Sequence, residues 1–210
     1  MPRIYGLIPL LIVLSVNVAA QGKAGIRKVD FRNNIFPFGA GAFADLPRRI
    51  HVRNGRYHSP HQEPSLTYSY FKVAEVVFGD LNGDNQDDAA VIAIYGGASS
   101  DTYGTSVYLY AMNGRRPKLV DVLNQKAVSR EYERRYDGGR SQLFESVADG
   151  TTIKRGLLTV KQLAGGGHCC PLNVFTLRYR LKEGRLALVS ESLRRRRETE
   201  ERIPHSVEDR

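Results

Sequence analysis

The feature that most constrains this 210-residue chain is a series of short segments in which apolar and polar residues alternate. The clearest is 173–181, where every second residue from Phe175 to Leu181 is apolar and two of the residues between them are arginines. Alternation of this kind is typical of a strand with one buried face. The pattern predicts a mainly β, antiparallel domain, built as one curled sheet or as two packed layers, with little helix.

Turn dipeptides separate these segments and define the expected organisation. Asn113-Gly114 and Glu183-Gly184 each predict a tight turn between two strands, and Asn54-Gly55 predicts a short hairpin joining 49–53 to 56–58. A turn or two of helix is expected within 125–136. Strands are expected over 72–79, 89–95, 103–112, 117–123, 142–147, 156–163, 173–181 and 185–192. The β domain then covers 71–190, after an irregular arm with short strands at 21–70.

The first twenty residues have the pattern of a secretory signal peptide. Arg3 precedes an apolar run from Ile8 to Val16, and Val18 and Ala20 are small residues suited to cleavage before Gln21. The run is too short to cross a bilayer, which needs about twenty apolar residues. We expect an exported protein with no transmembrane segment, located in the periplasm or outside the cell.

Basic residues exceed acidic ones, with a formal net charge of +9 that becomes +8 without Arg3. The charged tail at 191–210 has six basic and six acidic residues, so it is neutral, and its composition predicts a solvated helix or a frayed end. The excess therefore lies in the body. Basic residues distributed over the body in this way suit attraction to polyanions but give no specific nucleic-acid signal. They include Arg48, Arg49, Arg53, Arg56, Arg130, Arg134 and Arg135.

An acidic stretch interrupts this basic body between two apolar runs. Oxygen-bearing side chains occur at every second position in it, at Asp80, Asn82, Asp84, Gln86 and Asp88. Calcium takes six to eight oxygen ligands, and a tight loop with this spacing can wrap the ion, with the backbone carbonyl of Gln86 as one ligand. The sharp turn at the sixth position falls on Asn85, which tolerates a left-handed backbone. Val91 stands where an EF-hand has its glutamate, so strands rather than helices should flank the loop.

The stretch Phe78-Gly79 followed by "DLNGDNQDD" resembles the calcium loop of FG-GAP and VCBS-type repeats. That resemblance implies calcium bound by Asp80, Asn82, Asp84, Gln86 and Asp88. The stretch occurs once, so a complete propeller is not expected. More broadly, the chain is similar to small exported bacterial proteins with a single loop of this kind, a Gly-rich "HCCP" turn and a last β-hairpin. That group has no assigned activity, so this resemblance implies a fold and a location but no function.

Two interpretations of the acidic stretch remain open. It is either a metal site or a solvated acidic turn, and the metal site is favoured because crowded carboxylates repel one another by about a kcal/mol per near pair. Given a metal, we expect a structural role that fixes the hairpin. A catalytic role would need an open coordination position beside other catalytic groups.

Cys169 and Cys170 are adjacent in a Gly-rich turn and are the chain's two cysteines. The favoured interpretation is a vicinal disulfide that stiffens the turn, which would be strained and easily reduced. The alternatives are thiols that stay reduced or pair between molecules, a redox switch, and a soft-metal site with His168. His58 and His61 flank Pro60 and are interpreted as loop histidines.

The sequence thus favours an exported, calcium-stabilised β domain with a structural or binding role toward an unknown protein or surface component. The second hypothesis is a hydrolase or thiol-redox enzyme centred on the acidic loop or the cysteine pair. The third is a binder of polyanions, glycan or nucleic acid, through the basic patches, with affinity that falls as salt rises.

Overall fold

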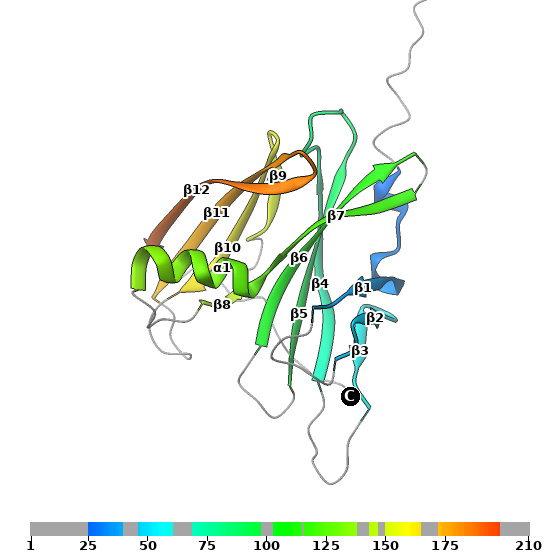
Figure 1. Cartoon of the computed structure of the whole chain (residues 1–210), viewed down its shortest axis with the longest axis horizontal. Helices are drawn as coiled ribbons and strands as arrows, with labels where there is room; N and C mark the ends of the chain where they lie inside the picture. The colour runs from blue at the N-terminus through cyan, green and yellow to red at the C-terminus, as the bar shows by residue number, and fades with distance from the viewer. Residues whose placement is uncertain are drawn as a thin grey trace, which may run out of the picture.

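A computed structural model of the chain describes residues 25–39, 46–60, 69–97, 103–114, 116–137, 143–146, 150–164 and 172–197. Short 3-10 helices come first, followed by strands, one α-helix and a π-helical turn (Figure 1). The elements, in order, are η1 (Ile26–Lys28), η2 (Phe31–Asn33), β1 (Ile35–Pro37), β2 (Arg49–His51), β3 (Arg56–His58), β4 (Ser69–Gly79), β5 (Asp88–Gly97), β6 (Tyr103–Asn113), β7 (Arg116–Asn124), α1 (Gln125–Tyr132), η3 (Glu133–Asp137), β8 (Leu143–Ser146), β9 (Thr152–Lys154), β10 (Leu157–Ala164), β11 (Asn173–Lys182) and β12 (Arg185–Arg195).

All strand pairs in the described residues are antiparallel. One five-stranded sheet has the order β3-β4-β5-β6-β7, and a second has the order β12-β11-β10-β8, with β9 also paired to β10. Strands β1 and β2 form a separate two-stranded sheet. The mainly β, antiparallel class predicted from the sequence is therefore confirmed.

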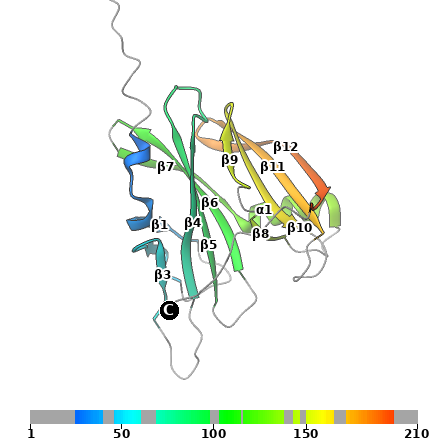
Figure 2. The same cartoon turned by 180° about the vertical axis from the view of Figure 1, so that it is seen from behind.

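The β3–β7 sheet is the middle layer, with the other elements on its two faces (Figures 1 and 2). Its central strand β5 is buried on both sides. Ala90 and Ile92 face one core with the second sheet, whereas Ala89, Val91 and Ala93 face another core with the N-terminal arm. The continuous apolar run from Ala89 to Ile94 is what such a strand requires, since neither face meets water.

The N-terminal arm, residues 25–39 and 46–60, packs its apolar side chains onto the middle sheet. Phe36 and Ile50 are fully buried, and the Phe36 ring lies 5.5 Å from Phe71 and 5.1 Å from Tyr108 between centroids. The Tyr108 hydroxyl also donates to the carbonyl of Pro37 at 3.0 Å. The arm, apart from β3, which belongs to the middle sheet, is thus a structured third layer.

Helix α1 closes one end of the core between the two large sheets. The Asn124 side chain accepts from the backbone N–H of Ala127 at 2.9 Å and so caps the helix. Val128 and Tyr132 are buried, and the Tyr132 ring lies 5.2 Å from that of Phe175 on β11. The expected turn or two of helix within 125–136 is confirmed.

One local prediction was confirmed in part and another was wrong. Asn54 and Gly55 form the expected tight turn, with φ values of 51° and 81°, and Arg53 and Arg56 pair across it as an antiparallel bridge. The pairing does not extend further, because β2 pairs with β1 and β3 pairs with β4. Residues 191–195, expected to be helical or frayed, continue β12 in register with β11. Leu193 packs against the core there, so burial outweighs the run of charged residues.

Candidate metal loop

The acidic stretch connects β4 to β5 as the strand–loop–strand unit expected from the sequence. Phe78 pairs with Ala89 and Gly79 with Asp88 at the base of the hairpin, so the loop runs from Asp80 to Asp87. It lies at the same end of the molecule as the tip of β9 in both views (Figures 1 and 2). Two long, paired strands therefore hold the ends of the loop.

The loop backbone turns sharply where the spacing predicts. Asn85 has φ 63°, the left-handed conformation anticipated at the sixth position. Gly83 also has a positive φ, of 83°, which glycine adopts without a steric penalty. Asn is the non-glycine residue best suited to this conformation, so the sequence and the backbone agree.

Side-chain oxygens of the predicted ligands organise this backbone. The Asp80 carboxylate accepts from the N–H groups of Gly83 at 2.6 Å and Asn85 at 2.9 Å. Asn82 Oδ1 accepts from the Asp84 N–H, and Asp84 Oδ1 accepts from the Gln86 N–H, both at 2.8 Å. Each such oxygen keeps a second lone pair, so these bonds position the oxygens and leave them able to accept a cation.

Asp88 differs from the other candidate ligands because it is buried, at 2% exposure. Its Oδ2 accepts from the N–H of Leu81 at 3.0 Å. The pKa of the Asp88 carboxyl is raised to about 6, chiefly by burial and in addition by the negative charges of Asp84 and Asp80, against the opposing effect of that hydrogen bond. A negative group held in this position would gain most from a neighbouring cation.

Asp87 connects the loop to the N-terminal arm. The Arg27 guanidinium on η1 pairs with Asp87 at 2.5 Å, and it also stacks over the Phe78 ring with 4.9 Å to the centroid. The Asp87 side chain is only 11% exposed, so this ion pair is partly shielded from water. Sixty residues separate the partners, and no local pattern in the sequence predicts the contact.

The loop also contacts the second sheet. Leu81 is 3% exposed and belongs to the core between the two large sheets, together with Ile153 of β9. A Cβ at Gly79 would lie 2.7 Å from the Ile153 carbonyl oxygen, so only glycine permits this close approach. The loop thus touches all three layers: the arm through Asp87, the middle sheet through its own strands, and the second sheet through Leu81.

The donor set suits calcium, although it is not gathered into a finished cage. In the described residues, no group of three or more His, Cys, Asp or Glu side chains is arranged to hold a metal ion. Asp80, Asn82 and Asp84 share one hydrogen-bonded network, and Asp88 interacts electrostatically with both aspartates. Calcium accepts carboxylate, amide and carbonyl oxygens in flexible geometry, and these are the oxygens that the loop carries.

The other candidate residues lie elsewhere or outside the described ranges. Cys169, Cys170, His168 and His61 fall outside them, as do residues 1–20. His58 is the last residue of β3 and is exposed. Among the basic residues noted in the sequence, Arg134 pairs with Glu131, and Arg135 pairs with Glu191 at 2.6 Å. Those two arginines are therefore largely neutralised.

Comparison with known proteins gives no relative for this chain. No family model, no curated protein and no solved structure matches it. Among the helices that the structure describes, none has the length and apolar character needed to cross a membrane. The functional argument therefore depends on the loop and on the surfaces around it.

Proposed function

We propose that this chain is an exported β domain stabilised by calcium, with a structural or binding role toward a protein or surface component. The observation that carries the proposal is the loop at 80–88, which combines alternating oxygen donors with the left-handed Asn85. Its ligands would be the side chains of Asp80, Asn82, Asp84 and Asp88 and the backbone carbonyl of Gln86. An exported location follows from the signal-like residues 1–20.

A cation would relieve an unfavourable arrangement of charge. Asp80, Asp84 and Asp88 lie close enough for their charges to interact, and Asp88 is buried. Arg27 is the described cation paired with the loop, and it neutralises Asp87 rather than the proposed ligands. Calcium adds two positive charges where the carboxylates repel one another, and calcium is a common ion outside cells.

The position of the loop favours a structural role over a catalytic one. The loop contacts the arm through Arg27 and the second sheet through Leu81, so fixing its conformation also fixes these two contacts. Bound calcium would then stabilise the junction of three layers. This arrangement predicts that metal affects the unfolding of the whole domain and not only of one hairpin.

Thermal unfolding with calcium and with EDTA tests the proposal. At one hundred times its dissociation constant, calcium should add about 2.7 kcal/mol to the free energy of unfolding. For a chain of this size the gain corresponds to a rise in Tm of about 5 to 10 °C. The variant Asp84→Ala should lose this response, because it removes one of the central carboxylates.

Glu183→Gln is the matched control, since Glu183 is an exposed carboxylate in the β11–β12 turn, distant from the loop in sequence. The control should respond to calcium as the parent does. An identical Tm in calcium and EDTA for the parent would reject calcium stabilisation. A calcium response that survives Asp84→Ala would reject this loop as the site.

A further inference from the structure

The outer face of the β1–β2 sheet combines cationic and amide side chains in a regular pattern. Along β2 and the residues after it, Arg49, His51 and Arg53 point outward, while Ile50 and Val52 are buried. Outward residues on one strand recur every second position, at a spacing of about 6.8 Å. In register with them, β1 places Ile35 beside His51 and Pro37 beside Arg49.

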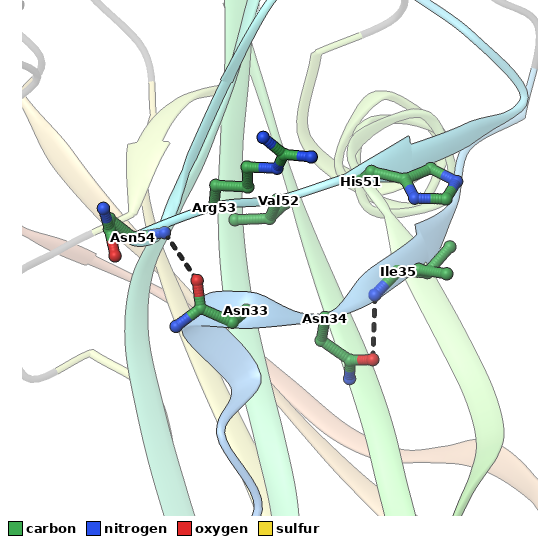
Figure 3. Close-up of a pocket in the computed structure, with 7 residues that line it drawn as sticks. All are labelled: Asn33, Asn34, Ile35, His51, Val52, Arg53 and Asn54. Atoms are coloured by element: carbon green, nitrogen blue, oxygen red, sulfur yellow. Dashed lines mark hydrogen bonds between the residues drawn. The ribbon is translucent and has the colours of Figure 1, made fainter.

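A pocket of about 430 Å³ opens on this face. Figure 3 shows its lining, which comes from the end of η2 and the start of β1 on one side and from β2 and its following turn on the other. The lining residues are Asn33, Asn34, Ile35, His51, Val52, Arg53 and Asn54. Six of these seven are exposed or half-exposed, so the pocket is open to solvent.

Hydrogen bonds and apolar packing hold this face in place. Asn33 Oδ1 accepts from the Asn54 N–H at 2.9 Å, and the Val52 N–H donates to the carbonyl of Asn34 at 2.9 Å. Beneath them, Phe36 and Ile50 are fully buried against the middle sheet. The outward side chains therefore project from a fixed scaffold, which suits binding better than a mobile loop does.

The arm that forms this face has a strong excess of positive charge. Residues 25–39 and 46–60 contain seven arginines and lysines, all exposed, and one acidic residue, Asp30. The basic residues are Arg27, Lys28, Arg32, Arg48, Arg49, Arg53 and Arg56. Arg27 is paired with Asp87 of the metal loop, and Arg56 lies on β3 of the middle sheet. The other five basic residues still outnumber the single acidic one, so this part of the arm would attract anions.

Several donors on this face have no partner among the residues that the structure describes. The side chains of Arg49, His51, Arg53 and Asn54 make no hydrogen bond or ion pair there. Asn34 Oδ1 accepts from the Ile35 N–H at 2.8 Å, and its amide N–H₂ is left to donate. Guanidinium groups bind carboxylate and sulfate oxygens, and amides bind hydroxyl groups.

We propose that the outer face of β1–β2 binds an anionic polysaccharide, one whose sugars carry carboxylate or sulfate groups. Arg49 and Arg53 bind successive acidic groups along the polymer. Asn34 and Asn54 donate to sugar hydroxyls in the pocket, and His51 lies between the two arginines. This site is separate from the metal loop, and its existence does not depend on calcium binding.

The composition of the face distinguishes a glycan from a nucleic acid. Proteins that bind single-stranded nucleic acid stack the bases on exposed aromatic rings. None of the lining residues that the structure describes is Phe or Tyr, and the chain has no tryptophan. Phe36 is buried, and Tyr57 and Phe38 are half-buried against the middle sheet. Amides and cations without a stacking platform fit hydroxyl-rich anions.

The test measures binding of the purified protein, in calcium, to fluorescent oligosaccharides across a salt series. Heparin supplies sulfates and hyaluronan supplies carboxylates, so the pair shows which acidic group is preferred. Neutral dextran and oligo-dT matched in charge are the comparison ligands. The double variant Arg49→Gln/Arg53→Gln should weaken binding roughly tenfold and reduce the slope of log affinity against log salt by about 2.

Arg178→Gln/Arg180→Gln is the control, because it removes the same charge from exposed positions on β11. It should leave binding almost unchanged. Equal loss in both double variants would overturn the proposal by showing diffuse attraction, as would unchanged binding in Arg49→Gln/Arg53→Gln. Tighter binding of oligo-dT than of either acidic glycan, or equal binding of dextran, would overturn the ligand class.

Discussion

Replacing Asp88 with asparagine should have opposite effects in the absence and presence of calcium. The substitution removes a negative charge from a position that is 2% exposed and lies beside Asp80 and Asp84. It keeps an oxygen that accepts from the Leu81 N–H, at 3.0 Å in the parent. Shape and that hydrogen bond are preserved, so the change isolates the contribution of the charge.

The magnitude follows from the pKa of Asp88, which is raised from 3.8 to about 6 in the folded protein. A folded pKa above the unfolded one means that the unfolded state gives up its proton at lower pH. The parent therefore loses stability as pH rises from about 4 to 6, and the loss persists above pH 6. Each pKa unit corresponds to 1.36 kcal/mol, which sets an upper value of about 3 kcal/mol for this loss.

In EDTA at pH 8, Asp88→Asn should therefore be more stable than the parent by up to about 3 kcal/mol. The advantage should shrink toward zero at pH 4, where the parent carboxyl is protonated. In saturating calcium at pH 8 the order should reverse, because the parent gains a bound ion and the variant has lost a ligand.

Urea unfolding at pH 4.5, 6 and 8, in EDTA and in calcium, measures these differences. Comparing variant with parent at each pH cancels the contributions of all other titrating groups. An Asp88→Asn variant that is less stable than the parent in EDTA at pH 8 would show that the carboxylate is already compensated by the protein. That result would refute the argument that the loop needs a cation.

Three further predictions follow from contacts around the loop and the core. Arg27→Gln should lower the free energy of unfolding by about 1 kcal/mol in urea titrations, because Asp87 is then left unpaired in the acidic loop. The loss should be greater in EDTA than in calcium, and a greater loss in calcium would contradict this. Burial and a hydrogen bond with Glu131 raise the pKa of Glu191, so the parent loses stability as this carboxyl ionises with rising pH. The free energy of unfolding of Glu191→Gln should therefore rise relative to that of the parent between pH 5 and pH 8. A difference independent of pH would be inconsistent with that burial. Gly79→Ala should cost about 1 to 3 kcal/mol, because the new Cβ meets the Ile153 carbonyl at 2.7 Å, whereas Gly39→Ala, with no atom within 4 Å, should be close to neutral.

Local patterns predicted most of the strands in the two large sheets. The expected strand at 173–181 is β11 at Asn173–Lys182, and the turn at Glu183-Gly184 adopts the positive φ values of 50° and 74° that such turns need. Alternation and turn chemistry act over a few residues, so the sequence displays them directly. β9 was not predicted, since its three residues are too short to show a period.

Contacts between distant segments could not be predicted in the same way. The Asn54-Gly55 turn and the pairing of Arg53 with Arg56 across it were predicted correctly. Beyond that bridge β3 pairs with β4 instead of β2, because the choice depends on how the arm packs on the middle sheet. Residues 191–195 form a strand because β11 offers a pairing edge and because Leu193, which is partly buried, packs against the core. Charge composition alone predicts neither the pairing of β3 with β4 nor the strand at 191–195.

For the candidate site too, the sequence predicted the local features but not the contacts between distant segments. The spacing of the donors predicted the left-handed Asn85 and the strands on either side of the loop. Burial of Asp88 and the ion pair between Arg27 and Asp87 arise from packing across the three layers. These tertiary contacts give the loop its proposed role at the junction of the layers.

Calorimetric titration of calcium into the protein tests the central claim most directly. The account predicts a single saturable site that is lost in Asp84→Ala and retained in Glu183→Gln. Titration of the parent with no saturable heat, or a site of equal affinity in Asp84→Ala, would contradict the assignment of 80–88 as a calcium loop.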